Sequence, residues 1–186
     1  MSFGKIYCSS WWGDESNKLS VPYFPEDCSL IPAVCGTQYS YSGNASFPES
    51  YKLDLGGSIG VSTLTFEAYS YPDKWVLIQD GQVILDTGYR GDANTWQTGL
   101  DEALALRGLP PETIQGIGQG SINFTVNSSS PVYVYVYAPI EGTAYNFTVS
   151  CPVSSQILSL LNTLQARATY FENFNGTVET LTNLEN

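Results

Sequence analysis

The chain has 186 residues, a net charge of −11, 42% hydrophobic and 13% aromatic residues, and no histidine. This length and composition favour one folded domain, with or without an appendage, over a disordered chain. Without histidine the hydrolytic triads and the usual catalytic zinc sites are excluded, so we expect no enzymatic activity and no cofactor. The 7 Lys and Arg residues are scattered, so we expect no nucleic-acid binding.

The chain also lacks segments of the kind that enter membranes. No run reaches the roughly 18 consecutive apolar residues that a membrane helix needs, so we expect no membrane insertion. The start of the chain, Met1–Lys5, does not resemble a signal peptide. A polar, weakly charged surface is typical of extracellular and virion proteins. The start at Met1 favours a virion protein that is made in the cytoplasm and released by lysis.

The first 50 residues are rich in proline, serine and aromatic residues and follow no regular period. So many prolines disfavour both a helix and a strand ladder. We therefore predict an extended arm over residues 1–50. Its adjacent aromatic residues, Trp11 and Trp12, are candidates for attachment to a partner surface.

The four cysteines, Cys8, Cys28, Cys35 and Cys151, do not have the paired spacing of a structural zinc site. We predict at least one disulfide, although four cysteines allow three pairings and the sequence does not choose among them. A bond between Cys28 and Cys35 would close a short loop and leave Cys8 to pair with Cys151 or with a neighbouring chain. The alternative is four reduced, buried thiols.

Residues 51–152 have the pattern of short strands separated by turns, and we predict that they form an antiparallel β-sandwich. In Gly60–Ala68 apolar and polar residues alternate, which is the period of a half-buried strand. Lys74–Gln79 and Gln82–Leu85 flank Asp80–Gly81, a favoured hairpin turn. The predicted fold class is mainly β, with a disulfide-bearing N-terminal arm and a C-terminal helix.

Two later segments alternate in the same way and complete the predicted sandwich. Ile122–Val126 and Tyr145–Val149 place apolar residues at every second position, and continuing the second pattern puts Cys151 on the core side. The residues before these strands, Asp92–Gly120, form a predicted insertion with a short helix around Leu100–Arg107.

The segment 153–186 is predicted to be a helix that joins copies of the chain. Its apolar residues recur with the seven-residue spacing of a coiled coil. Arg167 interrupts the pattern and Gly176 weakens the helix. We expect a homotrimer, with a dimer left open and with packing of the helix on its own sandwich as the alternative. The predicted seam consists of Ile157, Leu160, Leu164, Phe171, Phe174, Val178 and Leu181.

Acidic residues in the predicted turns suggest one candidate ligand site. Asp80, Asp86 and Asp92 supply the oxygen ligands that calcium prefers, but they lack the spacing of an EF-hand loop. Solvated turn carboxylates are the favoured interpretation.

A row of tyrosines is the second candidate. In Val132–Tyr137 the valines face one side of the predicted strand and Tyr133, Tyr135 and Tyr137 face the other. A host surface glycan could stack on such a row, although packing inside the protein is the favoured use.

The segments Tyr71–Val76, Asp80–Gln82 and Leu85–Gly88 resemble a signature of β-sandwich domains in the virion proteins of tailed phages. Ala138–Tyr145 and Ser150–Pro152 are similar to the closing strands of those domains. The resemblance implies a structural or attachment module without enzymatic activity, in contact with other virion proteins of the baseplate or capsid.

These observations lead us to expect a virion structural protein, most simply a tail fibre or a baseplate-attached fibre component. A capsid decoration protein and a secreted carbohydrate-binding module are the two alternatives. The three differ in location, since only the first two belong to a particle.

Overall fold

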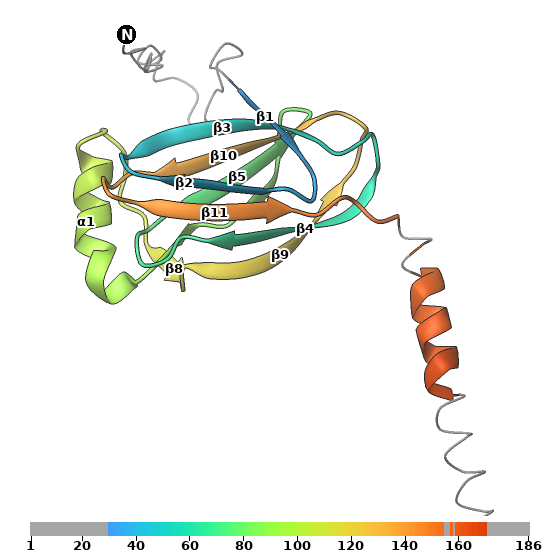
Figure 1. Ribbon diagram of the computed structural model, residues 1–186. Coiled ribbons are helices and arrows are strands. Elements are labelled where there is room, and N and C mark those ends of the chain that lie inside the picture. The colour runs from blue at the N-terminus through green and yellow to red at the C-terminus, as the bar shows by residue number, and fades with distance from the viewer. Residues whose placement is uncertain (1–29, 155–156, 158, 171–186) are drawn as a thin grey trace, which may run out of the picture.

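The computed structural model describes residues 30–154, 157 and 159–170. Two β-sheets pack face to face, and a helical segment projects from one end of them (Figure 1). The predicted class, mainly β with a sandwich architecture and a C-terminal helix, is confirmed.

The larger sheet, called sheet A below, has five strands, and the smaller sheet, sheet B, has four. A third sheet, made of two short strands, lies beside them. All pairings are antiparallel except β1 with β3 and β7 with β8. In spatial order, sheet A contains β1 (Ile31–Val34), β3 (Ser46–Asp54), β10 (Val132–Ala138), β5 (Lys74–Gln79) and β6 (Gln82–Asp86). Sheet B contains β2 (Gln38–Ser42), β11 (Ala144–Val149), β4 (Gly60–Glu67) and β9 (Gln119–Val126), and the short pair is β7 (Tyr89–Arg90) with β8 (Ile114–Gly116).

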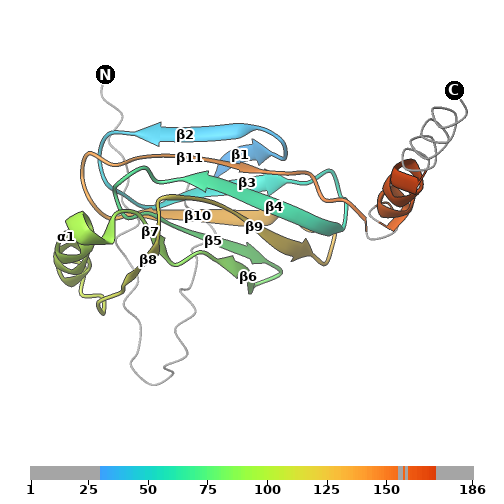
Figure 2. The same ribbon diagram turned by 90° about the horizontal axis from the view of Figure 1, so that it is seen from below.

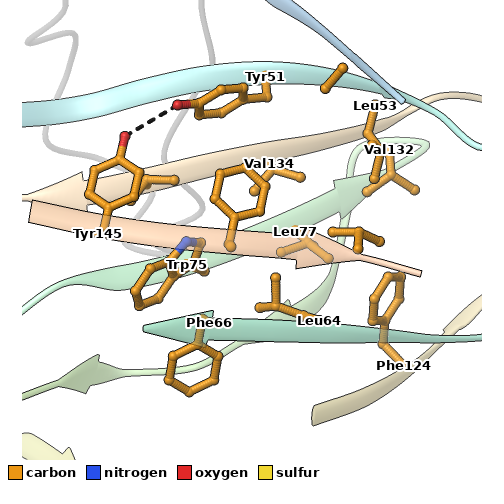
Figure 3. Packing of buried hydrophobic residues seen from close by; sticks show 14 of the residues in the cluster. Tyr51, Leu53, Leu64, Phe66, Trp75, Leu77, Phe124, Val132, Val134 and Tyr145 are labelled. Atoms are coloured by element: carbon orange, nitrogen blue, oxygen red, sulfur yellow. Dashed lines mark hydrogen bonds between the residues drawn. The ribbon is translucent and has the colours of Figure 1, made fainter. Parts of the chain in front are cut away.

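The core lies between the two sheets. It is built from the side chains that, at every second position of a strand, face the other sheet. Trp75 of β5 is fully buried and contacts Phe66 of β4 and Tyr145 of β11 with ring centroids 4.9 and 6.0 Å apart (Figure 3). The indole nitrogen of Trp75 has no hydrogen-bond partner, and the Tyr145 ring stands perpendicular to the indole. A π face is an adequate neighbour for the edge of an indole ring.

The predicted strands within 60–149 are confirmed. Leu64, Phe66 and Ala68 are buried, as the alternation of β4 indicates. The β5–β6 turn is formed by Asp80 and Gly81, whose φ angles are +51° and +74°. Such angles suit the two central residues of a tight hairpin turn.

The predicted boundary at residue 50 is wrong, because β1, β2 and most of β3 lie within the segment assigned to an arm. Proline did not prevent these strands from forming. Pro32 lies in β1, which is the edge of sheet A. Pro48 lies in the part of β3 that β1 does not reach, and the pairing of β10 shifts register beside it. Proline is tolerated where a backbone N–H needs no strand partner.

The helix of the insertion, α1 (Ala93–Ala105), begins earlier than predicted. Asp92 caps it, because its carboxylate accepts a hydrogen bond from the Asn94 backbone N–H at 3.0 Å. The Trp96 ring of α1 stacks on Tyr71 with centroids 4.3 Å apart. These contacts fix α1 across one end of the sandwich, away from the C-terminal helix (Figure 2).

A disulfide joins Cys35, just after β1, to Cys151, just after β11, with Cα atoms 4.9 Å apart. The prediction of at least one disulfide is confirmed, and the pairing of Cys28 with Cys35 is excluded. Cys151 is exposed, contrary to the predicted core position, because β11 ends at Val149 and its alternation stops there. Cys8 and Cys28 lie outside the described residues.

The chain leaves the sandwich along a fixed path beside β4. Val61 and Val153 exchange two backbone hydrogen bonds of 3.1 and 2.9 Å. The Ser62 hydroxyl donates to the Ser150 carbonyl at 2.6 Å. Gly60 is required here, because a Cβ atom would overlap the backbone of Val153. Ser150 and Val153 are therefore held against the sandwich.

We predict that replacing Cys35 and Cys151 together by alanine lowers the free energy of unfolding by roughly 3 to 5 kcal/mol. The bond closes a loop with a sequence separation of 116 residues and so restricts the unfolded chain. Guanidinium unfolding measures the loss, and Thr37→Ala, an exposed change nearby, is the control. Parental stability in the double variant would contradict the assignment, as would peptide mapping without a Cys35–Cys151 fragment.

Candidate functional surfaces

The tyrosine row of β10 is a packing surface. Val132, Val134 and Val136 point into the core and are fully buried, so the predicted division of the strand into two faces is correct. On the other face Tyr135 is 7% exposed and clusters with Val76 and Ile78 of β5, with Tyr133 and Tyr137 beside them. Burial raises the pKa of Tyr135 to about 12. The favoured interpretation, packing and not ligand stacking, agrees with this burial.

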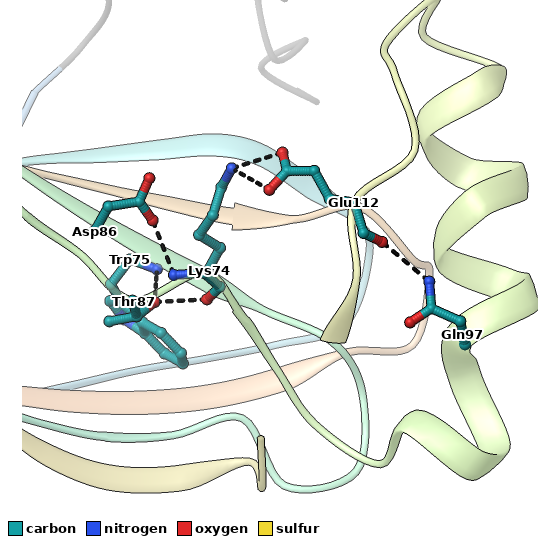
Figure 4. A network of polar contacts seen from close by, with 7 residues as sticks. Lys74, Trp75, Asp86, Thr87, Gln97 and Glu112 are labelled. Carbon is teal, nitrogen blue, oxygen red and sulfur yellow. Dashed lines mark hydrogen bonds and ion pairs between the residues drawn. The ribbon is translucent and has the colours of Figure 1, made fainter. Parts of the chain in front are cut away.

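Tyr137 is also covered by a lysine. The Lys74 ammonium lies 5.4 Å from the centroid of the Tyr137 ring and 4.9 Å from that of Tyr89. It pairs with both carboxylate oxygens of Glu112 at 2.8 and 3.1 Å (Figure 4). Gln97 of α1 donates to the Glu112 carbonyl at 3.0 Å. This network ties α1 to sheet A and covers Tyr137 at one end of the tyrosine row.

The three candidate calcium ligands do not meet, so they do not form the calcium site that was the less favoured interpretation. Asp80 accepts a hydrogen bond from Ser128 at 2.6 Å at the β5–β6 turn, and Asp92 caps α1. The length of β5, roughly 20 Å for six residues, separates the two ends. Asp86 accepts from the Gly88 backbone N–H at 2.9 Å. Each carboxylate has a local turn or capping role, and the described residues contain no group of three metal ligands.

Asp73 is a buried carboxyl group that sequence reasoning did not single out as functional. It is fully buried just before β5 and bonded through both oxygens to the Thr143 hydroxyl at 3.0 Å. Burial raises its pKa to about 8, and the bond from Thr143 only partly opposes this shift. A raised pKa is typical of catalytic acids, but no substrate reaches a group with no exposed surface.

The C-terminal helix carries the most exposed apolar surface with a regular arrangement. Every described helical residue from 157 to 170 is exposed, so this part of the helix does not pack on its own sandwich. Ile157 and Leu164 are each 52% exposed and Leu160 is 59% exposed. Leu161, also 52% exposed, lies on the same side of the helix, and these four residues form an exposed apolar stripe. The predicted seam omitted Leu161, because a coiled-coil pattern counts only two positions in every seven residues and Leu161 occupies neither.

Several predicted site residues lie outside the described residues. Trp11 and Trp12, the candidate attachment residues, are among them. So is the second half of the predicted seam, which comprises Phe171, Phe174, Val178 and Leu181. Within the described part of the chain, no helix has the length and apolar character that crossing a bilayer requires.

Comparisons with known proteins add little to this geometry. No protein-family model matches the chain, and no curated protein matches it. One solved structure similar to it is the pre-peptidase C-terminal domain of a collagenase from Bacillus anthracis, with a TM-score of 0.44 and 14% sequence identity. The match covers 69% of this chain and 99% of that one.

We predict that Asp73→Asn removes a pH dependence of stability. The folded-state pKa of about 8 lies above the ordinary value near 4, so the unfolded chain loses the proton first. The stability that the protonated group contributes is complete below about pH 4 and is lost as the pH rises to about 8. The free energy of unfolding falls by up to roughly 1.4 kcal/mol per pH unit in this window.

Urea unfolding at pH 5, 6 and 7 measures this slope. Asparagine has the shape of a protonated aspartate and stays neutral, so the variant should have a smaller slope and a higher stability at pH 7. Glu141→Gln, which removes an exposed carboxylate, is the control and should leave the slope unchanged. An equal slope in Asp73→Asn and the parent would contradict the assignment.

Proposed function

We propose that this chain is a non-enzymatic structural protein that assembles through its C-terminal helix, most simply as a homotrimer, and displays the β-sandwich. Its proposed place is a virion, as a tail fibre or a baseplate-attached fibre component. The exposed apolar stripe of the helix is the observation that carries assembly. The location in a virion rests on the sequence resemblance.

The stripe supports assembly because of its size. About half of the surface of each of these four residues is still exposed, and burying it removes apolar surface worth roughly 3 to 6 kcal/mol per chain from water, before ordering entropy is subtracted. Other copies of the chain are the simplest partner, because the same stripe is present on every copy. Arg167, which interrupts the seam, is the only charged residue among the described helical residues, so electrostatic repulsion between copies is confined to this one position.

The path of the chain supports display of the sandwich. The backbone bonds of Val153 and the Cys35–Cys151 disulfide hold the last residues before the helix against the body. The chain is therefore held to the body as far as Val153, at the end of the sandwich opposite α1 (Figure 1). An assembled helix would hold the sandwiches around it with their free ends outward.

The residues that resemble the phage signature have structural roles in this fold. Trp75 is in the core, Asp80 and Gly81 make the β5–β6 turn, and Thr87 accepts a hydrogen bond from the Trp75 backbone N–H at 2.9 Å. The signature therefore specifies a sandwich and no catalytic group. This supports the proposal of a structural module.

We predict that Leu164→Asp converts the assembly into folded monomers, because it places a charge in the apolar seam. Light scattering should give about three times 20.3 kDa for the parent and 20.3 kDa for the variant. Circular dichroism should keep its β-sheet signal. Asn162→Asp adds the same charge about 160° around the helix and should leave the mass unchanged.

Ionic strength tests the same idea in a second way. A seam of apolar residues should persist in 1 M sodium chloride, whereas an assembly held by surface ion pairs would weaken there. An oligomer that survives Leu164→Asp would refute assembly through the helix, and so would a monomeric parent. Immunolabelled electron microscopy of particles tests the location, and the absence of label on tail and capsid would refute it.

A further inference from the structure

The outward face of sheet B consists largely of uncharged hydrogen-bonding side chains. Along β2, β11, β4 and β9 most residues opposite the core are Ser, Thr, Asn or Gln. Glu67 is the one charged side chain at the outward positions of these strands, although the whole chain carries a net charge of −11. The face therefore offers hydrogen bonds without a strong local charge.

Cross-strand hydrogen bonds hold these side chains in place. The Thr63 hydroxyl donates to the Asn123 side chain at 2.8 Å, and the Thr65 and Ser121 hydroxyls lie 3.0 Å apart. Both pairs join β4 to β9 at directly opposite positions. Each hydroxyl or amide group in such a pair keeps further donor or acceptor capacity toward solvent. The result is an ordered and open polar surface.

Tyr69 supplies an exposed aromatic ring at the end of this face. It follows β4, is 54% exposed, and its hydroxyl accepts a hydrogen bond from the Asn146 side-chain amide at 3.2 Å. Because Asn146 points outward from β11, this bond directs the ring toward the outward face of sheet B. The Asn146 amide also donates to Glu67 at 3.1 Å.

The backbone of Tyr69 is fixed as firmly as its side chain. Its φ angle is +53°, a left-handed conformation that is uncommon for a tyrosine. The Gly118 backbone lies against it so closely that a Cβ atom at Gly118 would overlap the Tyr69 carbonyl. The Ala68 backbone N–H donates to the Gly118 carbonyl at 2.5 Å. The ring is thus ordered before any ligand arrives, which lowers the entropic cost of binding.

Sugars match this combination of groups. The C–H face of a pyranose ring packs on an aromatic ring, and its hydroxyls pair with amide and hydroxyl side chains. An acidic glycan would be repelled by Glu67 and by the net negative charge of the chain. We infer that the outward face of sheet B binds a neutral polysaccharide, with Tyr69 as the stacking platform. This site belongs to the sandwich and does not require assembly through the helix.

Native gels that contain a soluble polysaccharide test the inference with the full chain. The neutral probes are dextran, yeast mannan and galactomannan, and the acidic probe is polygalacturonate. The parent should be retarded by at least one neutral probe and not by the acidic one. Tyr69→Ala should raise the dissociation constant about tenfold or more, because it removes the aromatic anchor. Tyr170→Ala, at another exposed tyrosine outside the sandwich, is the matched control and should bind as the parent does.

Thr65→Arg is a second variant, which keeps Tyr69 and places a long charged side chain in the middle of the face. It should weaken retardation at least as much as Tyr69→Ala does, and it serves as the test if Tyr69→Ala fails to unfold cooperatively. Migration unaffected by every neutral probe would overturn the inference, as would retardation by polygalacturonate alone. Undiminished binding in folded Tyr69→Ala or Thr65→Arg would place the site elsewhere. Repeating the gels with Leu164→Asp separates the two proposals, since a monomer that still binds leaves this site intact.

Discussion

The link between the end of β1 and the end of β11 is the constraint on which the rest of the molecule depends. The Cys35–Cys151 disulfide spans 116 residues and joins the first strand of sheet A to the last strand of sheet B. Beside it, the Gly36 backbone N–H donates to the Val149 carbonyl at 2.7 Å. These bonds therefore tie the two sheets together and hold the chain against the body close to the point from which it departs toward the helix. An assembled helix would otherwise carry sandwiches on a loose tether.

The two sheets have outward faces of opposite character, and this difference decides what each face can do. The outward face of sheet A is apolar and buried where β10 and β5 meet, with Val76 5% and Ile78 4% exposed. That of sheet B is open and polar, and Thr65 and Ser121 are both exposed there. A covered face contributes to stability and is closed to ligands. An open polar face contributes little to the core and remains available for recognition.

Much of the sandwich could be predicted from the sequence, because strand alternation is a local property. It placed Leu64, Phe66 and Phe147 in the core, where they are buried. The same alternation is present in β2, where Tyr39 and Tyr41 pack against the core, but nearby prolines and serines obscured it. The partner of Cys35 could not be predicted in this way, since it depends on how distant strands meet. Nor could the separation of Asp80 from Asp92, which lie at opposite ends of a strand.

The site residues that sequence reasoning missed share one property, which is that their environment is made by other segments. Asp73 is buried by the packing of two sheets, and Tyr69 is held by Gly118 and Asn146 from β8–β9 and β11. A surface built from one aromatic ring and neutral hydrogen bonds binds weakly by itself, because water competes for every polar group. Polysaccharides repeat the same unit, so copies joined by a common helix would each engage one part of the same polymer. The effective concentration of the neighbouring faces would then add to the affinity that each single face has by itself. The proposed binding face and the exposed apolar helix would therefore be complementary features of one chain.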